Sequence, residues 1–196
     1  PVPLIIHGDL KPTNVLVGHG MRCKLCDFGC AHLWDGGQDE WMHVCENYNM
    51  FSPYWTAPER FNRRCRFVTG TEMTKGDIFS LGIILWEMVS RELPFGECPD
   101  CRVVPFKYAR GERPRLPTDL DEYPAVMTHL IERCWAHLPE QRPTATHALS
   151  MLEMHRPNWD EERARELDVI PETLEEKSGP VVVEEKRGTT TAPRRR

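Results

Sequence analysis

The chain has 196 residues, of which 40% are apolar and 28% are charged, a composition typical of a soluble globular protein with room for one domain and some additional sequence. The formal net charge of −5 is the opposite of a basic footprint, so no nucleic acid partner is expected. The longest apolar run, residues 81–89, contains Glu87 and falls well short of the ~20 apolar residues of a membrane-spanning helix, so it predicts a buried helix and no membrane segment.

The first predicted element is a β-hairpin. Residues 15–17 (VLV) are β-prone, residues 18–21 (GHGM) are typical of a turn, and residues 22–26 (RCKLC) predict the returning strand. After Asp27 the pattern changes to loops and helices. The chain is therefore expected to be mainly α, with one small β-hairpin on its surface.

Three helices are predicted further along the chain. The segment 74–90 is apolar nearly all round, which predicts a helix in the centre of the domain. The segment 125–137 has a helical apolar face, and the segment 144–155 predicts another helix that starts just after Pro143. The apolar face of the segment 125–137 consists of Val126, Leu130, Ile131 and Cys134.

The chain divides into three zones. Residues 1–155 alternate apolar segments with turn signals, as a folded domain does. Residues 156–170 predict one charged helix with Asn158 or Asp160 as its N-cap. Residues 171–196 contain few large apolar side chains and are expected to be disordered.

Eight cysteines would suit a secreted disulfide scaffold. The first residues, however, carry no basic stretch and lead into a charged loop, which is not typical of a secretory signal. Because free buried cysteines are common in cytosolic cores, a cytoplasmic location is expected. The pairs Cys23/Cys26 and Cys98/Cys101 have the CxxC spacing of zinc sites, but they lie about seventy residues apart, so ordinary thiols are favoured over zinc ligands.

Two oxygen donors flank the predicted hairpin. Asn14 comes just before the outgoing strand, and Asp27 comes just after the returning one. Antiparallel pairing brings the open ends of a hairpin together, so these side chains are expected to be neighbours. A carboxylate and an amide carbonyl are hard ligands that suit Mg²⁺.

Asp9 and Lys11 lie on the loop that leads into the hairpin, and Pro12 stiffens this loop. A carboxylate at this place can accept the proton of a hydroxyl beside a metal-bound phosphate. An ammonium can offset the charge of a transferring phosphoryl group. These residue types are also common in loops, so the segment on its own could be a simple turn with an Asx cap.

Five motifs together carry a family resemblance. The sequence resembles the eukaryotic protein kinases, and the motifs occur in family order over residues 1–155. They are HGDLKPTN (7–14), similar to the catalytic loop; DFG (27–29), similar to the magnesium loop; APE (57–59), similar to the end of the activation segment; DIFSLGIILWE (77–87), similar to the central helix of the large lobe; and CWAHLPEQRPT (134–144), similar to the turn before the last helix.

The resemblance implies roles for the loop and hairpin residues. Asp9 would be the catalytic base and Lys11 a contact to the phosphate of ATP. Asn14 and Asp27 would hold two magnesium ions. Leu16 matches the apolar position that packs under the adenine ring, although a plain core leucine fits the sequence equally well.

Other matched positions are structural. His7 matches a histidine that packs against the magnesium loop. Glu59 and Arg142 match a buried ion pair between the activation segment and the last helices. Asp77 matches the residue that holds the catalytic-loop backbone, and a helix N-cap is the alternative.

The same resemblance implies the substrate class. A lysine at Lys11 is usual in kinases that act on serine and threonine. Ser52 stands where that group usually has a threonine that meets the catalytic loop. The segments 54–59 and 134–144 are similar to the tyrosine-kinase-like branch, so a Ser/Thr kinase of that branch is expected.

Two features depart from the family. Gly8 replaces the arginine that pairs with a phosphate on the activation loop, so control by something other than loop phosphorylation is expected. The Gly-rich loop, the strand lysine and its partner glutamate belong upstream of the catalytic loop, where only residues 1–6 lie. The chain is therefore expected to be the C-terminal lobe of a kinase without the N-lobe, and its central helix is expected to expose apolar area.

The expected function is that of a kinase catalytic-domain fragment. In the parent protein it would transfer the γ-phosphate of ATP to serine or threonine of a protein substrate, with Mg²⁺ as cofactor, and the isolated chain is expected to be inactive. The alternative is a truncated, pseudokinase-like lobe that acts by binding. The intact set Asp9, Lys11, Asn14 and Asp27 favours the first hypothesis.

Overall fold

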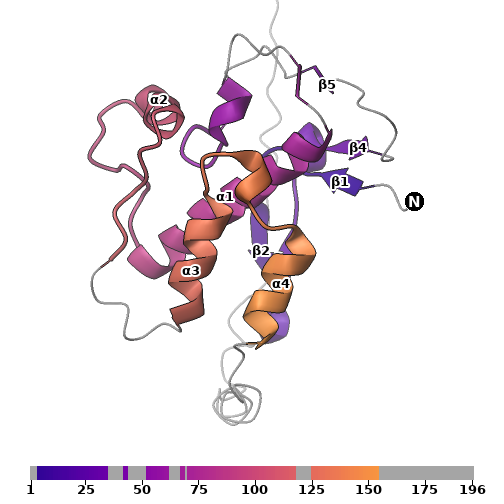
Figure 1. Ribbon diagram of the computed structural model, residues 1–196. Helices are drawn as coiled ribbons and strands as arrows, with labels where there is room; N and C mark the ends of the chain where they lie inside the picture. Colours follow the sequence, from indigo (N-terminus) through magenta and orange to yellow (C-terminus); the bar gives the residue numbers. More distant parts are fainter. Residues whose placement is uncertain are drawn as a thin grey trace, which may run out of the picture. The chain divides into compact units, whose positions relative to one another are not determined.

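The computed structural model describes residues 4–34, 42–43, 52–61, 67–68, 70–117 and 125–154 (Figure 1). These residues belong to the first of the two units into which the chain divides, Pro1–His155 and Arg156–Arg196. The helix predicted over 156–170 and the disorder predicted over 171–196 lie outside the described residues. Within the described ranges, no helix combines the length and the apolar character needed to span a bilayer.

The predicted hairpin is confirmed. Strand β2 (Val15–Val17) pairs antiparallel with β3 (Cys23–Leu25), with Val15 opposite Leu25 and Val17 opposite Cys23. A short 3-10 turn, η2 (His19–Met21), joins the strands, and the left-handed φ of 65° at Gly20 explains the glycine in this turn. A second 3-10 turn, η1 (Pro12–Asn14), leads into β2.

The expectation of a single hairpin is wrong, because the described residues form three two-stranded ribbons. Strand β1 (Leu4–Ile6) pairs antiparallel with β4 (His32–Trp34), and β5 (Met42–His43) pairs with β6 (Phe67–Val68). Their partners are distant in sequence and each strand has two or three residues, so neither a turn motif nor a period-2 pattern marks them. Between β3 and β4 lies the 3-10 turn η3 (Phe28–Cys30).

Helix α1 (Gly70–Ser90) crosses the middle of the first unit in Figure 1 and starts four residues before the predicted position. Its side chains Phe79, Ile83 and Trp86 are buried in the main core. The expectation that this helix exposes apolar area is wrong: Met88, at 59%, is its one strongly exposed large apolar side chain among those described. Strongly exposed apolar side chains lie instead on the short strands β1–β4 and on the other helices, where Phe106 is 64% and Met154 is 73% exposed.

Helices α3 (Ala125–Cys134) and α4 (Ala145–Met154) confirm the two remaining helix predictions. All four residues of the predicted apolar face on α3 are buried. Helix α3 packs against α1 and α4, and a Cβ added at Gly82 of α1 would lie only 2.8 Å from the Cβ of Cys134. Thr144 caps α4, because its Oγ1 accepts from the amide of His147 at 3.1 Å.

A further short helix, α2 (Val104–Ala109), lies against the 3-10 turn η5 (Pro58–Phe61) and follows the turn η6 (Cys101–Val103). The buried Tyr108 on α2 donates its hydroxyl to the carbonyl of Tyr54 at 2.6 Å. Burial raises the pKa of the Tyr108 hydroxyl, which keeps it a donor. Helix α2 thereby holds the segment that precedes η5.

Candidate functional site

The loop of residues 7–14, here called the site loop, runs from β1 to β2 and rests on α1. The Asp77 carboxylate accepts from the backbone amides of His7, at 2.7 Å, and Gly8, at 3.0 Å. Because α1 starts at Gly70, Asp77 lies inside the helix, and the alternative that it is an N-cap is wrong. Burial raises the pKa of Asp77, while the two backbone hydrogen bonds and the charge of Arg60 act in the opposite direction.

Asp9, Lys11 and Ser52 meet at one place. The Lys11 ammonium lies 2.7 Å from Oδ2 of Asp9 and donates to Oγ of Ser52 at 3.0 Å. The side chains of Lys11 and Asp9 are 25% and 10% exposed, so both can still be reached from solvent. A proton-accepting carboxylate and an ammonium are thus held side by side, next to a segment that is 41 residues away in sequence.

Asn14 is buried, with 5% exposure, at the base of the hairpin. Its side-chain Nδ2 donates to the carbonyl of Asp9 at 2.9 Å, which leaves its amide oxygen as the atom for a cation. The carbonyl of Asn14 accepts from the amide of Cys26 at 3.0 Å. This hydrogen bond closes the hairpin and brings Asn14 to the residue directly before Asp27.

Asp27 has an exposed side chain and a left-handed backbone, with φ of 60° and ψ of 68°. A non-glycine residue in this region is uncommon, and such conformations are enriched at functional sites. The neighbouring residues are fixed by His7, whose Nε2 lies 2.9 Å from the carbonyl of Cys26 and whose ring lies 5.0 Å from that of Phe28. His7 thus contacts the residues directly before and directly after Asp27.

The oxygens of Asn14 and Asp27 fit a magnesium ion in number and chemistry. The described residues contain no cluster of three or more His, Cys, Asp or Glu side chains that could hold a metal. Mg²⁺ usually takes one or two protein carboxylates and leaves its other positions to water and phosphate, so the two oxygens at this hairpin end suit it. The absence of such a cluster among the described residues also gives no support to a zinc site at the described cysteines.

Leu16 lies on β2 opposite Lys24 and is 53% exposed. The alternative of a plain core leucine is therefore wrong. Val17 and Leu25 on the same hairpin are 60% and 48% exposed. The hairpin thus presents apolar side chains beside the two oxygen donors.

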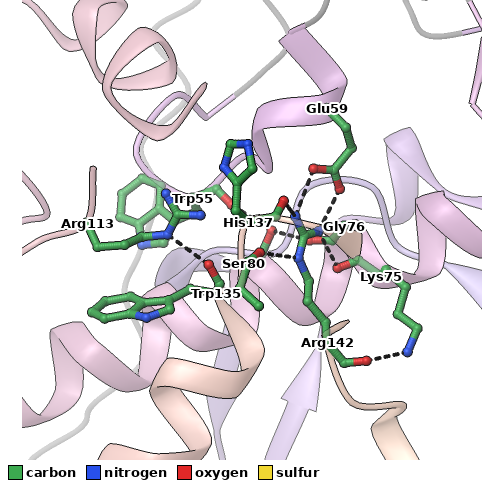
Figure 2. A network of polar contacts seen from close by, with 10 residues as sticks. Trp55, Glu59, Lys75, Gly76, Ser80, Arg113, Trp135, His137 and Arg142 are labelled. Carbon is green, nitrogen blue, oxygen red and sulfur yellow. Dashed lines mark hydrogen bonds and ion pairs between the residues drawn. The ribbon is translucent and has the colours of Figure 1, made fainter. Parts of the chain in front are cut away.

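Glu59 and Arg142 form a bidentate ion pair, with Nη1 2.6 Å from Oε1 and Nη2 2.9 Å from Oε2 (Figure 2). The other three N–H groups of the buried guanidinium donate to the carbonyls of Ala136, Lys75 and His137. All five donors of Arg142 are therefore used, which satisfies the charge in the core. The pair joins η5 to the segment before α4.

One contact of the site loop had no signal in the sequence. Arg60, the residue after Glu59, donates from Nη1 to the carbonyl of Gly8. The contact spans 52 residues, and an arginine next to a glutamate is by itself an ordinary surface pattern. Only the tertiary structure identifies Arg60 as part of the site.

Comparisons with known proteins identify the family of this chain. The sequence model of the protein kinase domain matches residues 3–152, so the chain belongs to the protein kinase family. Similar proteins include the dual specificity protein kinase shkD of Dictyostelium discoideum (33% identity over 76% of this chain), the serine/threonine/tyrosine-protein kinase HT1 of Arabidopsis thaliana (31% over 77%) and the mitogen-activated protein kinase kinase kinase 7 of Drosophila melanogaster (35% over 78%). The matched region is 18%, 35% and 20% of these relatives' own lengths.

Proposed function

We propose that this chain is the C-terminal lobe of a serine/threonine protein kinase of the tyrosine-kinase-like branch, which acts in the cytoplasm. The observation that carries the proposal is the meeting of Asp9, Lys11 and Ser52 beside the closed hairpin end that holds Asn14 and Asp27. The kinase family of the relatives supports a transfer of phosphate from ATP to a protein.

The proposed division of labour follows from the contacts. Asp9 accepts the proton of the substrate hydroxyl. The hydroxyl oxygen bonds to the γ-phosphorus of ATP while the bond between that phosphorus and the ADP oxygen breaks. Lys11, already beside Asp9, stabilises the negative charge of the transferring group. Asn14 and Asp27 hold Mg²⁺, which neutralises phosphate charge when bound.

The substrate class rests on the contact between Lys11 and Ser52. This contact ties the site loop to the segment 52–61. We propose serine and threonine as acceptors. Two relatives carry names that include dual or tyrosine specificity, so tyrosine is the competitor that an assay must include.

The exposed apolar strands support a second part of the proposal. Leu4, Ile5, Leu16, Val17 and Leu33 are 49 to 74% exposed on β1, β2 and β4. We propose that an N-lobe with the Gly-rich loop and the ATP-binding lysine covers this surface in the parent protein. The chain alone would then bind nucleotide weakly and transfer phosphate poorly.

Paramagnetic broadening by Mn²⁺ tests the metal site without requiring turnover. In amide spectra of the 196-residue chain with ADP, low Mn²⁺ should broaden the signals of Asn14, Cys26 and Asp27 first, because Mn²⁺ shares the oxygen ligands of Mg²⁺. Asp27→Ala should abolish this pattern. Asp100→Ala, which removes an exposed carboxylate far along the chain, should not.

Phosphate transfer to serine, threonine and tyrosine peptides, measured after a kinase N-lobe is joined upstream, tests the reaction itself. Transfer to serine or threonine that is lost in Asp9→Asn supports the proposal. Selective Mn²⁺ broadening without any transfer would favour the alternative, a pseudokinase-like lobe that acts by binding. Absence of both effects would contradict the assignment of the site.

A further inference from the structure

Arg60 holds the site loop through the same residue that α1 holds. Its Nη1 donates to the carbonyl of Gly8, while the amide of Gly8 donates to Oδ1 of Asp77 at 3.0 Å. The residue directly before Asp9 is therefore held at both of its backbone polar groups. One partner comes from α1 and the other from η5, and these two elements are far apart from the loop in sequence.

Gly8 itself cannot supply a side chain at this place. Its φ is +80°, and an added Cβ would lie 2.5 Å from the carbonyl oxygen of Cys30. Any other residue would strain the backbone and push against the segment after Asp27. A cation beside this peptide can therefore come only from another part of the chain, and the guanidinium of Arg60 is placed there.

The charges around Arg60 fit this arrangement. Burial lowers the pKa of Arg60, and the negative charges of Asp77 and Asp9 are the main groups that act against that shift. Glu59, the next residue, is already engaged with Arg142 through both of its oxygens. The two acidic groups that act most strongly on Arg60, Asp77 and Asp9, therefore hold or belong to the site loop.

We propose that Arg60 is a positioning residue that locks Gly8 and Asp9 to the segment 52–61, so that an in-chain cation organises the site loop without a phosphate on the activation segment. The inference rests on the proposed function for the meaning of Asp9, and its structural part can be tested separately. Arg60 acts through the Gly8 peptide and does not touch the reacting atoms.

Amide hydrogen exchange of the 196-residue chain measures this effect directly. In Arg60→Met the amides of Gly8 and Asp9 should exchange about tenfold faster or more, the factor that corresponds to loss of one hydrogen bond to a charged group. Arg60→Lys, which keeps the positive charge and an N–H group able to donate to the Gly8 carbonyl, should restore most of the protection. Arg102→Met removes an exposed arginine that pairs with Asp100 and should leave both amides unchanged.

Wild-type exchange at Gly8 and Asp9 in a folded Arg60→Met chain would overturn the inference. If that variant does not fold, Arg60→Lys is compared with Arg60→Gln, and equal protection in the two would overturn it as well. The Mn²⁺ experiment on Asp27→Ala separates the two proposals, because it tests the metal site without involving Arg60. Selective broadening at the hairpin end with unchanged exchange in Arg60→Met would refute the positioning role alone.

Discussion

At the scale of single residues, the site depends on buried charges that have specific partners. Arg142 has five hydrogen bonds for its five N–H groups, and Asp77 accepts two backbone amides. Both residues hold segments that carry candidate functional side chains. Substitution at either position should therefore affect stability in a way that depends on charge.

Removal of one partner of the ion pair should be costly. Glu59→Gln leaves the charge of Arg142 buried with weaker acceptors, so we expect the free energy of unfolding to fall by about 3–5 kcal/mol. Urea unfolding followed by fluorescence measures the change. Asp100→Asn, which breaks an exposed pair with Arg102, should change stability far less, and an equal loss in the two variants would contradict the assignment.

Asp77→Asn should change how stability depends on pH. Burial raises the pKa of Asp77 above its ordinary value of 3.8, so the folded chain binds more protons than the unfolded chain between these two pKa values, and stability from this group falls as pH rises through that interval. The variant has no carboxylate to lose this stability. The difference between its free energy of unfolding and that of the wild type should therefore increase as pH rises from about 4.

The matched control is Asp100→Asn, whose trend should have the opposite sign. Hydrogen bonds from Arg102 lower the pKa of Asp100, so this carboxylate contributes stability above pH 3.8 that is lost as pH falls. Urea unfolding series at several pH values give both differences. A parallel pH dependence for Asp77→Asn and wild type would show that the carboxylate is not titrating as proposed.

At the scale of elements, the approach of α1 to α3 is set by a glycine. A Cβ at Gly82 would lie 2.8 Å from the Cβ of Cys134 and 3.0 Å from the amide nitrogen of Trp135. Neither atom belongs to a flexible side-chain end. By contrast, a Cβ at Gly76 on the same helix would meet its nearest neighbour, Cδ of Arg60, at 3.6 Å, an ordinary contact.

Substitution by alanine should have opposite effects on stability at these two glycines. Gly82→Ala should destabilise the chain by about 1–3 kcal/mol because the helices must move apart. Gly76→Ala should leave stability unchanged or raise it by up to about 1 kcal/mol, because alanine is the better helix former. Thermal unfolding of both variants tests the pair, and equal destabilisation would show that helix contact is not the cause.

At the scale of the whole molecule, the core and the exposed apolar strands have different roles. The core gathers around α1, with Phe79, Leu130 and Ile131 fully buried. The strands near the site present apolar side chains to solvent, as a surface that contacts another partner does. The folded part should therefore be stable but prone to association through this face.

Substitutions on the exposed hairpin should separate these two properties. Leu16→Gln together with Val17→Thr should change the free energy of unfolding by about 0.5 kcal/mol or less and reduce self-association measured by light scattering. Leu130→Ala, in the core, should cost about 2–5 kcal/mol. Unchanged self-association in the hairpin variant would contradict the prediction that the chain associates through this apolar face.

The sequence alone determined the β2–β3 hairpin, the helices α1, α3 and α4 and the buried face of α3, because local periodicity and turn residues specify such elements. It also supplied the candidate residues of the site loop. The family resemblance placed Ser52 at the catalytic loop, and the structure gives its partner there as Lys11. Only the tertiary structure decided the β1–β4 ribbon and the contact of Arg60 with Gly8. The physical reason is that these contacts join segments about 28 to 52 residues apart, and such pairings leave no local pattern since packing around α1 creates them.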